Sequence, residues 1–204
     1  MELLLATGNA GKAREIEQML GRDFDVRAVD PRVEEAGKSF AENATLKAIA
    51  LSRQDRQPLV IADDSGLEVD SLGGAPGIFS ARYAGAGATD QQNIDKLLRA
   101  LADRKDRAAR FCCVIAVARA GELLRTFEGT VEGVVVDLPR GSGGFGYDPL
   151  FQPNGFEQTF GELPLELKHR ISHRGSAVRE LRSWLLQTQG FGGGGGSAPG
   201  GAPG

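Results

Sequence analysis

The sequence predicts a mixed α/β fold in which helices flank one long, twisted β-sheet. Short apolar runs alternate with segments of helical periodicity through the first half of the chain. Further along, two long β-rich runs, 110–119 and 123–136, flank Ala120-Gly121-Glu122, a pattern typical of a β-hairpin. Alternating strands and helices followed by adjacent strands favour a single α/β domain built on a mixed sheet.

Composition narrows the class of protein. The chain has 204 residues, of which 41% are hydrophobic and 25% charged, as in an ordinary soluble protein. Its net charge of −3 provides no field that would gather nucleic acid, and no apolar run approaches the roughly 20 residues of a membrane span. Cys112 and Cys113 are adjacent in an apolar run, which suits buried thiols in a reducing compartment. We therefore expect a cytoplasmic protein with no nucleic-acid or membrane partner.

In the first half of the chain, strands are expected at 2–6, 24–29 and 58–61. A helix follows the turn that ends at Lys12, because its apolar residues recur on one face. The next helix should begin with the capping-box spacing at 39–42 and run to about Arg53.

In the second half, a capping box at 89–92 opens a helix, and a last helix is expected from Ser172 to about Gln187. Glycine-rich loops are expected at 73–77 and 141–149. From Gly190 onward the chain is nearly all glycine, alanine and proline, which leaves almost nothing to bury. We therefore expect one globular domain over residues 1–188 and a disordered tail over residues 189–204.

Two adjacent carboxylates, Asp63 and Asp64, follow the apolar run 58–61, where we expect the strand to end in a Ser-Gly turn. Neighbouring side chains on a strand point to opposite faces, so the two have different roles. A carboxylate at a strand end suits a Mg²⁺ ligand or a base that deprotonates water, and Asp64, next to Ser65, is the candidate. The alternative is an Asx-turn that only ends the strand.

A phosphate site is indicated between the first strand and the first helix. Glycines, a hydroxyl and a lysine precede a helix N-terminus, whose backbone N–H groups attract anions. The segment is not a P-loop, because too few residues separate its glycines and Ala13 stands where that motif needs Ser or Thr. An ordinary tight turn is the alternative. The residues concerned are Thr7, Gly8, Asn9, Ala10, Gly11 and Lys12.

The helix from Phe40 carries a second clue, because Lys47 lies on its otherwise apolar stripe. A lysine there either snorkels to the edge of the protein or meets a buried anion. Upstream, the loop residues Glu34 and Glu35 offer a pair of carboxylates, unless they form only a solvated acidic turn.

Two later segments are typical of a site for a planar base. Phe145 and Tyr147 lie in a glycine-rich loop and can stack on a base, with Asp148 accepting hydrogen bonds from its edge. A packed aromatic corner is the alternative. His173 and Arg174 begin the last helix, where cations oppose the helix dipole and so indicate a ligand.

Lys168 and His169, just upstream of that helix, add basic residues, and we expect His169 to be an exposed loop residue. Together these segments predict a nucleotide site with Mg²⁺. They offer carboxylates for a metal, a lysine-glycine turn for phosphates, and two loops with aromatic and basic residues for a base.

Seven motifs follow one another along the chain: Thr7–Lys12, Glu42–Ala48, Ala62–Leu67, Gly73–Gly77, Ser80–Tyr83, Gly144–Pro149 and Ser172–Gly175. In this order they resemble the non-canonical purine nucleoside triphosphate pyrophosphatases, the inosine triphosphatase (XTP/dITP diphosphatase) family, in its bacterial form. The resemblance covers about residues 1–188.

Carried over motif by motif, the resemblance implies that Asp64 is the proton acceptor and a metal ligand. It implies that Glu34 is the other Mg²⁺ carboxylate and that Ser65 contacts the substrate beside the acid. The remaining implied substrate contacts are Thr7, Gly8, Asn9, Ala10, Gly11, Lys12, Lys47, Phe145, Gly146, Tyr147, Asp148, Lys168, His173 and Arg174.

The resemblance also implies a two-lobed domain with a central cleft, a homodimer, and hydrolysis of ITP, dITP or XTP to the monophosphate and pyrophosphate. Such a reaction keeps these bases out of DNA and RNA. The residues leave two other classes open. A phosphate-releasing NTPase or kinase should show a P-loop, and a non-catalytic nucleotide sensor has no need of Asp64 beside a metal carboxylate.

Overall fold

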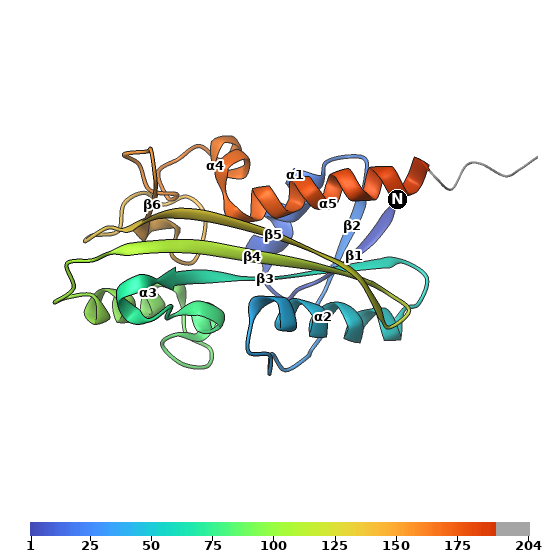
Figure 1. Cartoon of the computed structure of the whole chain (residues 1–204), viewed down its shortest axis with the longest axis horizontal. Helices are drawn as coiled ribbons and strands as arrows, with labels where there is room; N and C mark the ends of the chain where they lie inside the picture. The colour runs from blue at the N-terminus through green and yellow to red at the C-terminus, as the bar shows by residue number, and fades with distance from the viewer. Residues whose placement is uncertain (191–204) are drawn as a thin grey trace, which may run out of the picture.

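The computed structural model describes residues 1–190, and these form a six-stranded mixed sheet with helices on both faces (Figure 1). The strands are β1 (Glu2–Ala6), β2 (Asp25–Val29), β3 (Leu59–Val69), β4 (Ala108–Arg119), β5 (Glu122–Val135) and β6 (Phe151–Pro153). The α-helices are α1 (Ala10–Leu20), α2 (Phe40–Gln54), α3 (Asp90–Ala100), α4 (Leu165–Ile171) and α5 (His173–Gly190). Three short 3₁₀ helices are η1 (Asp70–Leu72), η2 (Gly77–Arg82) and η3 (Asp148–Leu150).

Across the sheet the strands follow the order β2-β1-β3-β4-β5-β6. Strand β1 is parallel to β2 and β3, whereas β3, β4, β5 and β6 pair antiparallel. The α/β class and the mixed sheet that the sequence predicts are therefore confirmed. The expected hairpin joins β4 to β5 through Ala120 and Gly121, whose φ values of 54° and 89° suit a tight two-residue turn.

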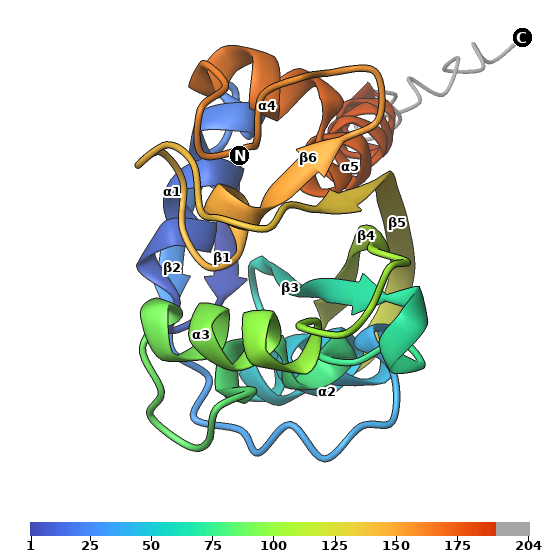
Figure 2. The same ribbon diagram turned by 90° about the vertical axis from the view of Figure 1, so that its left-hand side faces the viewer.

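Successive side chains of the central strands pack into two different hydrophobic cores. Leu3 of β1 and Ile61 of β3 pack beneath α1 and α5, whereas Leu4 and Val60 pack beneath α2. Figure 2 shows α2 and α5 on opposite sides of the sheet. A third core cluster fills the far end of the long strands, around Leu97 of α3, with residues of β6. The division of the domain into two lobes stays a prediction.

Strand β3 continues to Val69 and does not end before Asp63 as predicted. Asp63 and Asp64 lie opposite Ile115 and Val114 of β4, within a continuous antiparallel ladder. The predicted turn was wrong because β4 offers backbone partners along the whole segment, and this pairing outweighs the local turn preference of Ser and Gly. The two carboxylates therefore stand on a rigid central strand.

Gly66 allows η2 to pack directly on β3. A Cβ atom at this position would lie 2.4 Å from both Gly77 O and Ser80 Oγ. The Leu67 N–H donates to Ser80 Oγ at 2.9 Å, and this hydroxyl donates to Gly77 O at 2.7 Å. The glycine-rich loop before η2 thus folds the chain back over the strand that carries the carboxylates.

Helix α4 is an element that sequence reasoning missed, and His169 lies on it. This histidine is half-buried, so the expectation of an exposed loop residue was wrong. The neighbouring Lys168 is 2% exposed, and its ion pair with Glu15 of α1 holds the segment against the body of the protein.

Helix α5 extends to Gly190, three residues beyond the predicted end at Gln187 and past the expected boundary at 188. The remainder of the predicted tail, 191–204, lies outside the described residues. Within residues 1–190, no helix combines the length and apolarity that crossing a membrane requires.

Candidate active site

Two cavities open on β3 and share one wall. The large cavity, about 250 Å³, lies between the first turn of α1, α3 and the 145–148 loop. The small cavity, about 170 Å³, lies between the turn after β1, the 30–35 loop and α2. Both are lined by Asn9, Lys12, Ser65 and Ala81. One ligand can therefore reach from one cavity into the other.

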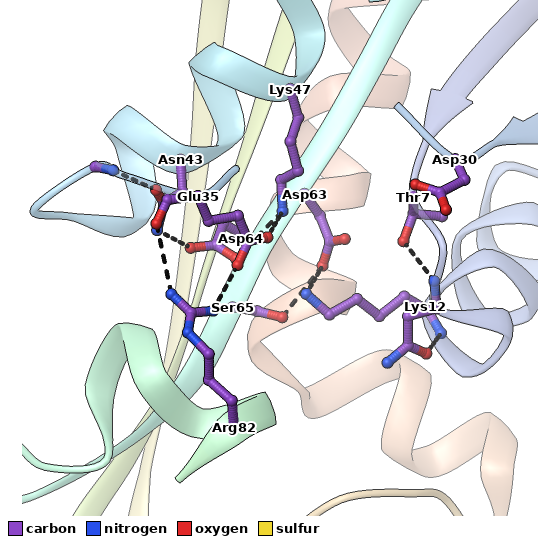
Figure 3. A network of polar contacts seen from close by, with 12 residues as sticks. Thr7, Lys12, Asp30, Glu35, Asn43, Lys47, Asp63, Asp64, Ser65 and Arg82 are labelled. Carbon is purple, nitrogen blue, oxygen red and sulfur yellow. Dashed lines mark hydrogen bonds and ion pairs between the residues drawn. The ribbon is translucent and has the colours of Figure 1, made fainter. Parts of the chain in front are cut away.

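Asp63 is fully buried on the face of β3 that α1 and α5 cover. Its Oδ2 lies 3.3 Å from Lys12 Nζ and accepts a hydrogen bond from Ser65 Oγ at 3.1 Å (Figure 3). The same oxygen lies 3.4 Å from Arg174 Nη2. Burial raises the pKa of a carboxyl, but the Lys12 ammonium and the Arg174 guanidinium outweigh it and hold the pKa of Asp63 well below its usual range. Asp63 therefore stays charged and anchors cations from two helices.

Asp64 points to the opposite face, toward α2, as the strand geometry predicts. Asn43 Nδ2 donates to its Oδ2 at 3.1 Å, and Lys47 Nζ lies 3.3 Å from its Oδ1. Burial raises the pKa of Asp64, and the Lys47 and Lys12 ammonium groups only partly offset it. Asp64 lines the small cavity and is thus a more basic carboxylate than an ordinary aspartate.

Lys47 meets a second carboxylate in the 30–35 loop. Its Nζ donates to Glu35 Oε1 at 2.8 Å, so this buried lysine binds anions and does not snorkel. Arg82 Nη1 donates to the other oxygen of Glu35 at 2.9 Å. Burial raises the pKa of Glu35, but Lys47 and Arg82 outweigh it, so the pKa is lowered. Glu35 lines the small cavity, whereas Glu34 is exposed.

The turn after β1 offers backbone donors to an anion. Asn9 Oδ1 caps α1 by accepting from Lys12 N–H at 3.0 Å, and Thr7 Oγ1 accepts from Asn9 N–H at 3.1 Å. The other N–H groups of the first helical turn have no acceptor within the helix. Of the six residues in the predicted phosphate site, Thr7, Gly8, Asn9 and Lys12 line the small cavity, and Ala10 and Gly11 do not.

Phe145 forms an aromatic wall of the large cavity. Its ring packs against Gly11, where a Cβ atom would lie 2.7 Å from the ring. Lys168 Nζ and Arg174 Cζ lie 5.3 and 5.5 Å from the ring centroid, within the range of cation–π attraction. Gly11, Phe145 and the two cations therefore bring the predicted phosphate turn and the predicted base loops into contact.

Glu15 of α1 joins these two cations, and sequence reasoning missed it. Lys168 Nζ donates to Glu15 Oε1 at 2.6 Å, and Arg174 Nη1 donates to Oε2 at 2.5 Å. Burial raises the pKa of Glu15, but Arg174 and Lys168 outweigh it and lower the pKa. Glu15 lies three residues after Lys12, on the same inward face of α1, and this spacing could have predicted its place in the site.

Three further predicted residues complete the large cavity. Asp148 Oδ2 accepts from Phe145 N–H at 2.8 Å and from Lys168 Nζ at 2.6 Å, so it already serves the protein's own donors. Tyr147 is buried, and its hydroxyl donates to Ser80 O at 2.9 Å. Gly146 also lines the cavity.

His173 lies at the wall of the large cavity with its ring stacked on Phe111, at a centroid distance of 4.7 Å and an interplanar angle of 9°. Burial, aided by the positive charges of Arg174 and Lys168, lowers the pKa of His173 well below its usual value. The imidazole is therefore neutral at physiological pH, and Lys168 and Arg174 supply the positive charge on this side.

The carboxylates of the site could provide a hard divalent cation with two protein ligands at most. Within residues 1–190, no three His, Cys, Asp or Glu side chains gather closely enough to hold a metal by themselves. Mg²⁺ usually takes one or two carboxylates together with substrate phosphates and water. Asp64, which opens on the small cavity beside the phosphate turn, fits that pattern.

The mixed sheet, the partly aromatic cavity and the adjoining cavity lined by two lysines together fit the class of α/β nucleotide-binding proteins. The model of the Ham1 family matches residues 3–184. The chain therefore belongs to the Ham1 family, which confirms the resemblance found in its motifs.

Curated relatives and solved structures agree. The dITP/XTP pyrophosphatase of Bacillus licheniformis is 45% identical over 194 residues, covering 91% of this chain and 98% of that protein. The dITP/XTP pyrophosphatase of Gloeobacter violaceus is 50% identical over 184 residues, covering 89% and 92%. The structure of the Staphylococcus aureus Ham1 protein, 40% identical, covers 92% of this chain and 100% of that one with a TM-score of 0.82.

Proposed function

We propose that this protein hydrolyses ITP, dITP and XTP to the nucleoside monophosphate and pyrophosphate, and so keeps these bases out of DNA and RNA. The observation that carries the proposal is the junction of the two cavities at β3, where carboxylates and cations alternate beside an aromatic wall. Relatives at 45% and 50% identity are named dITP/XTP pyrophosphatases.

In this reaction water attacks the α-phosphorus in line with the leaving pyrophosphate. Asp64 accepts the proton of the attacking water, a role that its raised pKa favours. Lys12 and Lys47 offset the negative charge that develops on the pyrophosphate. The free N–H groups at the start of α1 hold phosphate oxygens in position. Ser65, which lines both cavities, contacts the substrate between its two ends.

We propose Mg²⁺ as the cofactor, which Asp64 and Glu34 would hold. When bound, it would neutralise phosphate charge and polarise the bond that breaks. Glu34 is exposed and has no ion-pair partner within residues 1–190, so its oxygens are free for a ligand. Glu35, by contrast, is already bound to Lys47 and Arg82.

Base selection follows from the donors on the large cavity. Lys168 has three N–H donors, of which Glu15 and Asp148 take two. The third, with Arg174 and the backbone of the Phe145–Tyr147 loop, can donate to O6 of hypoxanthine or xanthine. The N6 amino group of adenine would leave these donors unpaired, at a cost of about 1–3 kcal/mol per group. Guanine shares O6, so its rejection has to act at the 2-position.

We also propose that the protein is a cytoplasmic homodimer, as the family resemblance implies. The free Cys112 and Cys113 suit a reducing compartment. Light scattering on the purified protein should give about twice the 21.6 kDa mass of one chain, and a monomeric mass would contradict the dimer.

One assay tests the proposed reaction. The protein is incubated with ITP, XTP or ATP and Mg²⁺, and the products are identified. We expect monophosphate and pyrophosphate from ITP and XTP, and much slower release from ATP. Orthophosphate or a diphosphate product would overturn the proposal in favour of a phosphate-releasing NTPase. Tight ITP binding without turnover would overturn it in favour of a sensor.

A further inference from the structure

Arg82 belongs to the Ser80–Tyr83 motif, and the proposed reaction has given it no role. It ends η2, and its half-buried side chain donates from Nη1 to Glu35 Oε2 at 2.9 Å and from Nη2 to Glu35 O at 3.5 Å. Its chain neighbour Ala81 lines both cavities. Figure 3 shows its guanidinium on the same side of β3 as Lys47 and Asp64. Arg82 therefore stands at the rim of the small cavity.

The backbone around Arg82 is fixed, although its side chain has an exchangeable partner. Asn93 of α3 is 3% exposed, donates to Ala81 O at 3.2 Å and accepts from Ala84 N–H at 2.8 Å. These two bonds clamp the chain on either side of Arg82. The guanidinium itself is held by Glu35 and by the exposed ring of Phe79, 5.3 Å away. A fixed backbone carrying a solvent-accessible guanidinium suits ligand binding.

Arg82 balances the charge of the small cavity. Three carboxylates line the small cavity, those of Asp30, Glu35 and Asp64, and three cations lie in or beside it. Lys12 and Lys47 supply two of these cations and Arg82 supplies the third. Without Arg82 the carboxylates would outnumber the cations, and the cavity would repel the triphosphate that it has to bind.

Glu35 bridges Lys47 and Arg82. One of its oxygens accepts from Lys47 and the other from Arg82, at 2.8 and 2.9 Å. Two oxygens of one phosphate group would bridge the same pair of cations in the same way. A guanidinium also offers phosphate two parallel donors, which an ammonium cannot. Glu35 thus holds Lys47 and Arg82 as a phosphate group would.

We propose that Arg82 is a further catalytic residue, which exchanges Glu35 for oxygens of the substrate's triphosphate and stabilises the departing pyrophosphate. The proposal rests on the proposed function for the identity of the triphosphate. The rival explanation is that Arg82 merely supports Glu35 and never contacts the ligand.

Binding of inorganic tripolyphosphate, measured by calorimetry with EDTA present, separates these explanations without turnover. If Arg82 binds phosphate, Arg82→Ala weakens binding about tenfold, whereas Glu35→Gln strengthens it by releasing the arginine. If Arg82 only supports Glu35, the two substitutions shift binding in the same direction or leave it unchanged, which overturns the proposal. Arg110→Ala is the matched control, because Arg110 also pairs with carboxylates, Asp70 and Glu132, but neither of these lines the small cavity, whereas Glu35, the partner of Arg82, does.

Turnover supplies the second readout. Arg82→Ala should lower kcat for ITP about a hundredfold, with Arg82→Lys between it and the wild type because a lysine keeps the charge but loses the fork. Unchanged kcat in both variants would overturn the catalytic role, and circular dichroism verifies that each variant is folded. If the wild type fails to hydrolyse ITP, the proposed function fails, while tripolyphosphate binding still decides whether Arg82 contacts phosphate.

Discussion

Asp63 and Asp64 are neighbours on β3, yet their carboxylates face opposite sides of the strand and their pKa values move in opposite directions. Asp63 pairs with Lys12 and Arg174, whereas Asp64 pairs with Lys47. Of these two adjacent residues, Asp63 therefore has a structural role, whereas Asp64 is available for chemistry.

Substituting the two aspartates should consequently give different losses. Asp64→Asn should lower kcat about 10³-fold while leaving ITP binding and folding measurable, because it removes the proton acceptor. Asp63→Asn should destabilise the fold by about 3–5 kcal/mol, because it removes the buried carboxylate that Arg174 and the partly buried Lys12 share. Steady-state kinetics and urea unfolding measure the two effects. Near-normal turnover in Asp64→Asn would remove this residue from the mechanism.

The two glutamates of the 30–35 loop should also behave differently. Glu34→Gln should raise the Mg²⁺ concentration needed for half-maximal activity about tenfold, because one of two carboxylate ligands is lost. Glu35→Gln should leave this requirement nearly unchanged, because Glu35 is engaged by Lys47 and Arg82. A Mg²⁺ titration of both variants provides the measurement. The reverse result would make Glu35 the ligand and refute the assignment of Glu34.

Stability should fall as the pH drops below about 6.5, because of His173. The unfolded chain binds a proton at this histidine near its ordinary pKa of 6.5, whereas burial lowers the pKa in the folded protein well below that value. Between the two pKa values, only the unfolded state is protonated. Each pH unit therefore removes up to about 1.4 kcal/mol from the free energy of unfolding.

Urea unfolding at several pH values between 5 and about 7 measures this slope for the wild type and for His173→Asn. The difference between the two slopes cancels the contribution of the carboxylates. His169→Asn is the control, because it is the only other histidine in the chain and is less buried. Equal slopes in wild type and His173→Asn would mean that His173 titrates normally in the folded protein.

Much of the site follows from short-range patterns. Helix and strand periodicity, which the sequence displays, predicts three features of the site. These are the capped turn with Lys12, the inward position of Lys47 and the opposite orientation of Asp63 and Asp64. The contacts that periodicity cannot predict join distant segments. Lys168 and Glu15 are separated by 153 positions, and Arg82 and Glu35 by 47. The continuation of β3 past Asp64 likewise depends on β4, a strand far along the chain.

Base discrimination should depend on Lys168, because two of its three donors are fixed by Glu15 and Asp148 and the remaining one can face the base. Lys168→Met should lower kcat/KM for ITP and reduce the ratio of kcat/KM values for ITP and ATP about tenfold or more. It also leaves Glu15 and Asp148 short of a cation, so unfolding has to be measured alongside. Lys105→Met, at an exposed lysine outside both cavities, is the matched control. An unchanged ratio in a folded Lys168→Met variant would show that selectivity for O6 comes from Arg174 or the loop backbone.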